Sequence, residues 1–352
     1  MRIALVGAGN IAARYAAAIS AAPELELGGV ADLDHARAQT LAGAHGGRAY
    51  PDLAAVLDDA SIDTVVNLTA PQAHAEVTAA ALRARKHVHS EKPLALRFED
   101  AVHLTELALQ HGVRLSSAPA TLMGEAQQTL WKLVRERAAG RVRAVYAEAN
   151  WDRLEAWHPD PRSLYAVGPV VDVGVYPLAI LTAIFGPVRG VRAFAATLEP
   201  ERTLLAGTTF TLEAPDFWVV VLRHEGGVIS RLTATFYVGP SKQRGIEVHG
   251  DTGSIHMPTW AEANSRVEVQ RRGTDRYERV ELVREPFSGI DWGRALVDLA
   301  AAIDEGRPHR ASAEHAAHVV EVLEATSTAA ASGGDVPVRS AFTAPEPMEW
   351  AL

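Results

Sequence analysis

The chain has 352 residues, a formal net charge of −9 and no cysteine. This length predicts two domains, and a composition of 48% hydrophobic and 22% charged residues is typical of a globular protein. The acidic balance argues against a nucleic-acid partner, which would need a basic face, and the absence of cysteine excludes disulfides, thiol catalysis and thiolate metal sites.

No apolar run in the sequence reaches the roughly 18 residues that a membrane-spanning helix needs. The first predicted apolar strand begins at residue 2, and no basic leader segment precedes it. We therefore expect a cytoplasmic protein with no membrane partner. The histidine pairs lack the carboxylate neighbours and the spacing of a usual metal site, so we expect no metal.

Strands and helices alternate over the first third of the chain. Five apolar runs are predicted to be strands, and helical segments follow most of them. This alternation is typical of βαβ units and a parallel sheet. The predicted strands are residues 2–6, 25–31, 63–69, 86–89 and 112–118.

The carboxyl ends of these strands carry unusual residues. Ligands of parallel α/β sheets bind at this edge. The end formed by Glu91, Lys92 and Pro93 differs from a bland turn of Gly, Asn or Asp, so Lys92 is expected to point into a ligand cleft. The other chemically distinctive ends read Gly7-Ala8-Gly9, Asp32 and Thr69-Ala70-Pro71.

The first two of these ends predict a dinucleotide site. Gly7 allows a tight turn, Gly9 lets the backbone approach a pyrophosphate, and the helix that follows offers free N–H groups. Asp32 comes 20 positions after Ala12, where an acid accepts hydrogen bonds from the adenosine ribose. A carboxylate there repels a 2′-phosphate and favours NAD, whereas Arg37 keeps NADP as the alternative.

Beyond residue 118 the pattern changes to strands joined by short turns. We expect a Rossmann domain over 1–118 and an α/β domain over 119–352 that binds substrate and mediates oligomerisation. Strands without intervening helices indicate a large, open, mostly antiparallel sheet, and the Gly226-Gly227 pair predicts a two-residue hairpin loop within it. Such a sheet leaves a face or an edge uncovered, which favours a homodimer or homotetramer.

One helix of the second domain, predicted over 168–187, is almost entirely apolar. Its polar exceptions, Asp172 and Tyr176, are spaced i, i+4 and share one face. A buried carboxylate is costly unless a charged or hydrogen-bonding group meets it, and Lys92 is the natural partner. The alternative is structural: Asp172 caps the helix and Tyr176 belongs to the core.

Three blocks together resemble the glucose–fructose oxidoreductase / inositol dehydrogenase family, written Gfo/Idh/MocA. They are "GAGNIA" (7–12), "TAPQAHAEVTAAALRARKHVHSEKP" (69–93) and "DVGVYPLAILTAIFG" (172–186). The resemblance covers essentially the whole chain and implies a Rossmann domain followed by an α/β domain with a large open antiparallel sheet. It also implies hydride transfer between NAD or NADP and a secondary hydroxyl of a sugar, glycoside or cyclic polyol.

The resemblance implies a set of site residues. Lys92, Asp172 and Tyr176 would line the nicotinamide end of the cleft and contact substrate, with Tyr176 standing where many relatives have His. Two departures from the family are Arg85 and Ala166-Val167-Gly168, where relatives have glycines, and the second leaves the substrate undecided. The residues implied for the cofactor are Gly7, Gly9, Asn10, Ile11, Asp32, Thr69, Pro71, His74, Glu91 and Lys92.

The loop 150–165 indicates the substrate class. Trp151, Trp157, His158 and Tyr165 lie among polar residues just before the Asp172 helix. Indoles over the apolar face of a sugar ring, with polar groups for its hydroxyls, are typical of carbohydrate sites. We predict Trp157 and His158 as substrate contacts; packing at a domain or subunit interface is the alternative.

The proton transfer has two assignments. Oxidation of a secondary alcohol needs a base for the hydroxyl proton, and either Lys92 or Tyr176 can be that immediate carrier, with Asp172 as the orienting group. Two rival functions remain: an NAD-dependent glycoside hydrolase or lyase that oxidises its sugar transiently, and a non-catalytic NAD-sensing regulator. Retention of all three side chains argues against the regulator.

Overall fold

The computed structural model describes all 352 residues, which form two compact units. The first unit comprises Met1–Ala120 and Asp291–Val320, and the second comprises Thr121–Ile290 and Glu321–Leu352. Each unit has its own sheet. The division of cofactor and substrate binding at residue 118 stays a prediction.

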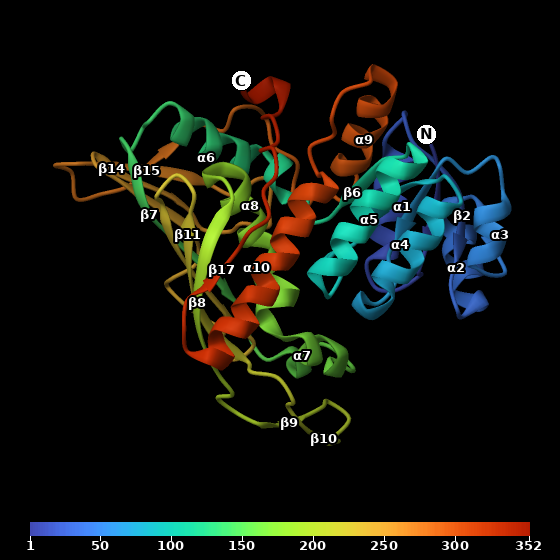
Figure 1. The fold of residues 1–352 in the computed structure, drawn as a ribbon, viewed down its shortest axis with the longest axis horizontal. Coiled ribbons are helices and arrows are strands. Elements are labelled where there is room, and N and C mark those ends of the chain that lie inside the picture. Colours follow the sequence, from blue (N-terminus) through green and yellow to red (C-terminus); the bar gives the residue numbers. More distant parts are fainter. The chain divides into compact units, whose positions relative to one another are not determined.

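The first unit is built on a parallel sheet (Figure 1). Its strands are β1 (Arg2–Val6), β2 (Glu26–Ala31), β3 (Arg48–Tyr50), β4 (Thr64–Asn67), β5 (His87–Ser90) and β6 (Leu115–Ser117). They pair in the order β3-β2-β1-β4-β5-β6, and every pair is parallel. The parallel α/β sheet expected from the sequence is confirmed.

Helices cover both faces of this sheet, as its apolar strands require. One layer buries Ile3 of β1 against Leu296, and the other packs Val65, Leu104 and Val320 together. Residues 291–320 thus return to the first unit. The helices are α1 (Ala12–Ala21), α2 (His35–His45), α3 (Leu53–Asp58), α4 (His74–Arg83), α5 (Phe98–His111), α9 (Arg294–Glu305) and the start of α10 (Ala313–Ser332).

The five strands predicted for this unit are all present, and the short elements β3 and α3 are additional. Arg85, just after α4, has a φ of 58°. This is the left-handed region that glycine adopts most easily, so the departure from the family's glycine is accommodated at a helix end.

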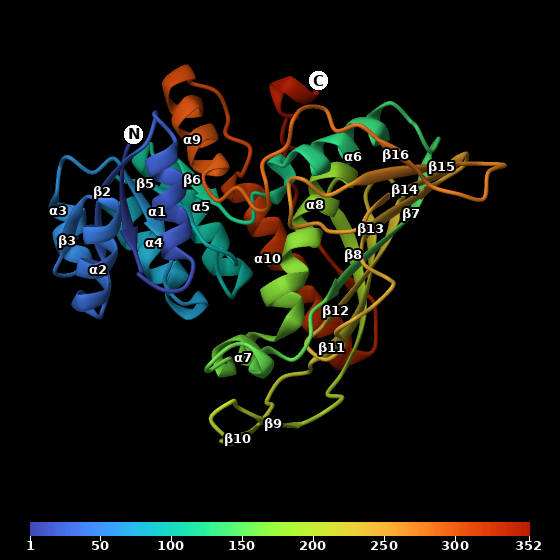
Figure 2. The same cartoon turned by 180° about the vertical axis from the view of Figure 1, so that it is seen from behind.

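The second unit is built on a mixed sheet of nine strands (Figure 2). Its strands are β7 (Val142–Asn150), β8 (Val188–Ala196), β11 (Phe217–His224), β12 (Ile229–Thr235), β13 (Gly245–Gly250), β14 (Gly253–Met257), β15 (Val267–Arg271), β16 (Glu278–Val280) and β17 (Val336–Pro337). The order is β16-β15-β14-β13-β7-β12-β11-β8-β17, and only β7 and β12 pair in parallel. A mostly antiparallel sheet is confirmed, as is a hairpin at Gly226-Gly227. Its loop is longer than the predicted two residues, because His224 N donates to Val228 O at 2.9 Å.

Two helices, α6 (Glu125–Arg135) and α8 (Val175–Phe185), pack on one face of this sheet (Figure 2). Strand residues that point to them, such as Val145 and Leu232, are buried, whereas Tyr146 on the opposite face is 41% exposed. A separate hairpin, β9 (Glu201–Thr203) and β10 (Thr209–Thr211), lies beside α7 (Arg162–Pro169). The sheet therefore keeps one face open.

The predicted apolar helix consists of two parts. Val170–Gly174 forms a π-helical turn, α8 follows directly, and the chain leaves α8 at Gly186 with a φ of 83°. The longer helical segment Arg162–Phe185 could span a membrane by length and composition alone, but 72% of its most apolar window is buried inside the protein. It has the burial of a core helix.

Candidate functional site

The turn after β1 has the geometry of a dinucleotide-binding loop. Gly7 has a φ of +105°, and a Cβ there would lie 2.6 Å from the backbone oxygen of Leu68, so only glycine fits. A Cβ on Gly9 would meet no atom within 4 Å, which leaves open space beside the backbone. No side chain caps the start of α1, so the positive end of the helix dipole can face an anion in that space.

This contrast gives a paired prediction. Gly9→Ala should leave the melting temperature unchanged but weaken NAD(H) binding by about tenfold or more, because the methyl group fills the space for the pyrophosphate. Gly7→Ala should instead destabilise the first unit, by about 1–3 kcal/mol from backbone strain before the clash with Leu68 is added. Thermal denaturation and NADH fluorescence titration separate the two effects. Equal cofactor affinity in Gly9→Ala and the unaltered protein would contradict the assignment of this loop.

Asp32 is fixed at the end of β2 by backbone donors. Its Oδ2 accepts a hydrogen bond from Ala8 N at 2.6 Å, and its Oδ1 accepts one from Asp34 N at 2.8 Å. A carboxylate has about four acceptor positions, so it retains capacity for ribose hydroxyls. The Asp32 carboxylate is thereby held against the glycine loop.

A cavity of about 460 Å³ opens next to the glycine loop, between α1 and α2. It adjoins the glycine loop at Ala8 and Gly9 and extends along α2, and Asp32 is not among its lining residues. Arg37 lines it, and the Arg37 Nε lies 3.4 Å from Asp34 Oδ2. The residues around the cavity are Ala8, Gly9, Ala13, Ala36, Arg37, Thr40, Leu41, Ala44 and His45.

The turn after β4 is shaped by Asn67, a residue that the sequence analysis missed. Asn67 is fully buried, and its Oδ1 accepts hydrogen bonds from Thr69 Oγ1 at 2.7 Å and Thr69 N at 3.2 Å. Its amide nitrogen donates to Thr78 Oγ1 at 3.1 Å. Asn67 therefore fixes the position of Thr69 at the carboxyl edge.

His74 connects this turn to the turn that carries Lys92. The imidazole is 1% exposed, with Nδ1 2.7 Å from the backbone oxygen of Pro93 and Nε2 2.9 Å from that of Thr69. Both ring nitrogens thus face backbone carbonyls. Any contribution of His74 to cofactor binding, which stays a prediction, would act through the turns it joins.

Glu91 anchors the end of β5. Its buried carboxylate accepts hydrogen bonds from the Tyr15 hydroxyl at 2.8 Å and from Lys92 N at 3.0 Å. Tyr15 belongs to α1 and also packs on Trp292, with ring centroids 5.6 Å apart. Burial lowers the pKa of the neighbouring His89 to about 3, so this imidazole stays neutral. Lys92, which is half-buried, therefore follows directly after a strand end that is rigidly held.

In the second unit, Asp172 and Tyr176 lie on one continuous helical segment. Asp172 is in the π-helical turn and Tyr176 is in the first turn of α8, and both are half-buried. Short π-helical turns occur frequently at functional sites. The Tyr176 ring stacks on Trp260, with centroids 5.1 Å apart and an interplanar angle of 26°. Trp260 was not among the predicted site residues.

The loop before α7 presents two indoles. Trp151 and Trp157 stack with centroids 6.1 Å apart, and they are 41% and 52% exposed. His158 meets Trp157 edge-on at 5.5 Å. Tyr165 differs from these residues: it is 3% exposed and its hydroxyl donates to Glu155. Burial and this hydrogen bond raise the pKa of Tyr165, so the phenol stays protonated.

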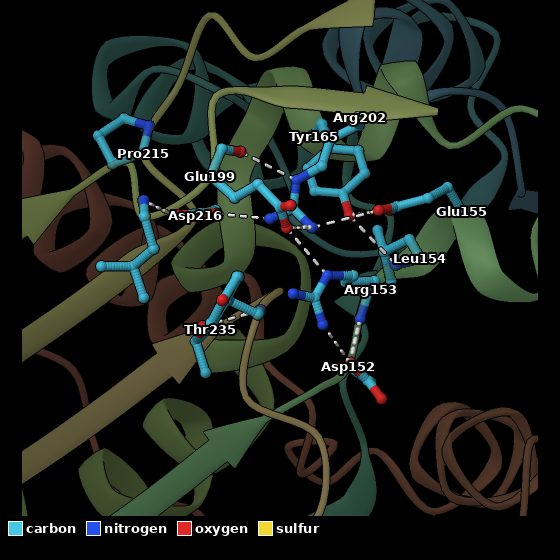
Figure 3. Close-up of polar contacts among 12 residues, drawn as sticks. Asp152, Arg153, Leu154, Glu155, Tyr165, Glu199, Arg202, Pro215, Asp216 and Thr235 are labelled. Carbon is cyan, nitrogen blue, oxygen red and sulfur yellow. Dashed lines mark hydrogen bonds and ion pairs between the residues drawn. The ribbon is translucent and has the colours of Figure 1, made fainter. Parts of the chain in front are cut away.

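A buried arginine holds the same loop (Figure 3). Arg202, in β9, is 2% exposed and donates from Nη1 to Glu155 Oε1 at 3.1 Å and from Nη2 to Asp216 Oδ2 at 2.6 Å. Its Nε donates to the backbone oxygen of Glu199 at 3.0 Å. The guanidinium thus joins the loop 150–165 and the segment before β11 to its own segment at β9.

The structure brings the predicted cofactor residues of the first unit to one sheet edge, and it places Asp172 and Tyr176 on one helical segment. The convergence of Lys92 with these two residues stays a prediction, because they belong to different units. No group of three or more His, Cys, Asp or Glu side chains is arranged to hold a metal ion.

Comparison with known proteins gives two family matches. The model described as oxidoreductase family, NAD-binding Rossmann fold, matches residues 1–118. The model described as GFO/IDH/MocA C-terminal domain matches residues 127–256. Successive parts of the chain thus match the two domains of one family.

Individual relatives agree with these matches. The chain is 32% identical over 193 residues to dTDP-3,4-didehydro-2,6-dideoxy-alpha-D-glucose 3-reductase of Streptomyces violaceoruber, covering 54% of this chain and only 56% of that protein. It is 26% identical over 302 residues to D-xylose dehydrogenase of Paenarthrobacter nicotinovorans, covering 78% of this chain and 76% of that protein. Levoglucosan dehydrogenase, solved in complex with NADH and levoglucosan, shares the fold with a TM-score of 0.82 at 23% identity, over 96% of this chain and 99% of that chain. The protein belongs to the Gfo/Idh/MocA family of oxidoreductases, and residues 1–118 form its NAD-binding Rossmann domain.

Proposed function

We propose that this protein is an NAD(P)-dependent oxidoreductase that transfers a hydride between the nicotinamide and a secondary hydroxyl of a sugar, glycoside or cyclic polyol. The observation that carries this proposal is the carboxyl edge of the parallel sheet. There the Gly7 turn, the fixed Asp32 carboxylate and the anchored Lys92 lie at the ends of three strands. The names of the relatives, which include dehydrogenases of xylose and levoglucosan, support the substrate class.

The chemistry divides between cofactor and protein. NAD(P) supplies a hydride acceptor or donor when bound. The protein must orient the alcohol and move its hydroxyl proton. Lys92 or Tyr176 carries that proton and Asp172 orients the partners. Glu91 supports this role because it holds the backbone of Lys92 in place.

A substrate screen tests the proposal. Purified protein is incubated with NAD or NADP and a panel of sugars, polyols and glycosides, and the absorbance of the reduced cofactor is followed. Net reduction with at least one secondary alcohol is the expected result. Cleavage of a glycoside without net NADH would identify the hydrolase or lyase alternative. Cofactor binding without turnover of any compound would identify a regulator.

The position of Asp32 makes a prediction about cofactor choice. The unaltered protein should prefer NAD over NADP, because the carboxylate repels a 2′-phosphate. Asp32→Ser should weaken the binding of NADH and strengthen the binding of NADPH, and so change the ratio of the two dissociation constants by about tenfold or more. Fluorescence titration measures both constants without a substrate. Arg37→Ala in the Asp32→Ser background should reverse the gain for NADPH, and an unchanged ratio in Asp32→Ser would contradict this role.

The open face of the nine-stranded sheet supports a homodimer or homotetramer. Phe194, Val221 and Ile229 lie on this face and are 63%, 38% and 41% exposed. Val221→Asp should therefore lower the mass measured by light scattering after size exclusion, because a charge would enter the interface. Leu109→Asp, at a 73% exposed position on α5, is the matched control. A monomeric unaltered protein would contradict the proposal. We place this assembly in the cytoplasm, without a membrane or nucleic-acid partner.

A further inference from the structure

We propose that Trp260 is a positioning residue that fixes the ring of Tyr176 in the orientation needed for proton transfer. This inference rests on the proposed function and deepens it. The two side chains come from separate elements: Tyr176 from the first turn of α8, and Trp260 from the loop between β14 and β15. Their rings stack 5.1 Å apart at 26°, within the offset geometry that aromatic pairs favour.

Trp260 is itself held from two sides. Its Nε1 donates a hydrogen bond to the backbone oxygen of Glu148 in β7, at 2.9 Å. Its backbone oxygen accepts one from Gln127 Nε2 in α6, also at 2.9 Å. Gln127 is fully buried and donates to the backbone oxygen of Glu262 as well, at 3.2 Å. The indole is thereby tied to the sheet, and the backbone that carries it is tied to a helix, so the indole acts as a fixed wall.

A fixed wall has a specific consequence for Tyr176. The neighbours of Tyr176 along α8 include Val175, Pro177 and Ile180, and none of these is aromatic. The indole plane blocks the swing of the whole side chain about its Cα–Cβ bond. This swing, and not rotation of the ring about its own axis, is what moves the hydroxyl oxygen, so the contact sets the position of the hydroxyl. Misplacement of a reacting group by about 1 Å can cost roughly 100-fold in rate.

Two other roles for Trp260 make different predictions. If Trp260 only filled space, its loss would lower stability and leave the kinetic constants of the folded enzyme unchanged. If it only bound substrate, its loss would raise KM for the substrate and leave kcat unchanged. A positioning role lowers kcat at saturating substrate and changes the pH dependence of kcat, while cofactor affinity stays constant.

The test compares Trp260→Ala, Trp260→Phe and a matched control, Trp218→Ala. Trp218 is also half-buried and also donates to a backbone carbonyl, that of Pro215 at 3.1 Å. We expect Trp260→Ala to lower kcat at least about tenfold and to shift the pH profile of kcat. Trp260→Phe should recover much of the loss because a phenyl ring still stacks. Trp218→Ala should match the unaltered enzyme.

A second measurement works without turnover. With 3-fluorotyrosine at position 176, the ¹⁹F resonance should shift and sharpen in Trp260→Ala, as the ring leaves the indole and rotates freely. An unchanged spectrum together with an unchanged kcat would overturn the inference and leave the proposed function intact. A screen without any turnover by the unaltered protein would overturn the proposed function, and the fluorine spectrum would then still decide whether Trp260 holds the Tyr176 ring.

Discussion

Lys92→Ala is expected to lower kcat by about 10²–10⁴-fold, the range that a positioned acid or base contributes. The substitution removes the ammonium group but keeps the backbone N–H that binds Glu91 at 3.0 Å. The strand end and the buried Tyr15–Glu91 hydrogen bond should therefore persist. The affinity for NAD(H) should change little, because the pyrophosphate loop and Asp32 lie at other strand ends.

Steady-state kinetics and NADH fluorescence titration, measured on the same samples, check this expectation. Lys242→Ala is the control, since Lys242 is exposed in a surface loop. Small primary amines added to Lys92→Ala should restore part of the activity if Lys92 itself takes the proton. Tyr176→Phe should then retain more activity than Lys92→Ala. Turnover by Lys92→Ala equal to that of the unaltered protein would remove Lys92 from the chemistry.

The sequence predicted those parts of the fold whose pattern is local. Strands buried on both faces produce continuous apolar runs, and this pattern was plainest for β1 and β4. The turn at Gly7 and the carboxylate at Asp32 follow directly from such runs, and their spacing has a chemical meaning. The apolar helix around Tyr176 was recognisable from Pro169 at its start and from Gly186 and Pro187 at its end.

What the sequence could not predict depends on partners far apart in the chain. Tyr15 lies in an alanine-rich helix, and only the structure shows its hydrogen bond to Glu91, 76 residues later. Trp260 meets Tyr176 across a comparable separation. An amphipathic pattern also does not say which sheet a helix covers, so the return of 291–320 to the first unit had no local signal.

Tyr165 shows that the composition of a loop does not determine which of its side chains are exposed. The sequence placed it among the tryptophans and polar residues of the loop 150–165, beside the predicted substrate contacts Trp157 and His158. The structure shows it 3% exposed, with its hydroxyl donating to Glu155 and accepting from Leu154 N. An aromatic residue in a polar loop binds a ligand only if its partners inside the protein leave it exposed, and here they do not.

Those partners are organised by Arg202, and removal of this side chain should have the largest effect on stability (Figure 3). Glu155 and Asp216 are 7% and 0% exposed, and both are hydrogen-bonded to the guanidinium. Arg202→Ala would leave two buried carboxylates without their cation. Breaking a buried ion pair in this way costs about 3–5 kcal/mol. Arg202→Lys should recover only part of this, because an ammonium lacks the planar fork that reaches three acceptors.

Two measurements, urea unfolding and hydrogen exchange, locate the effect. In Arg202→Ala the transition of the second unit should move to lower urea, and exchange should rise in the loop 150–165. Arg143→Ala removes a two-bond ion pair with Asp251 whose side chains are 56% and 47% exposed, so its transition should stay close to that of the unaltered protein. An unshifted transition in Arg202→Ala would show that the cluster contributes no net stability. At urea concentrations below the unfolding transition, the Arg202→Ala variant should have a raised KM for the substrate and a smaller decrease in kcat. The substitution loosens the loop that carries Trp157 but leaves Lys92 in place.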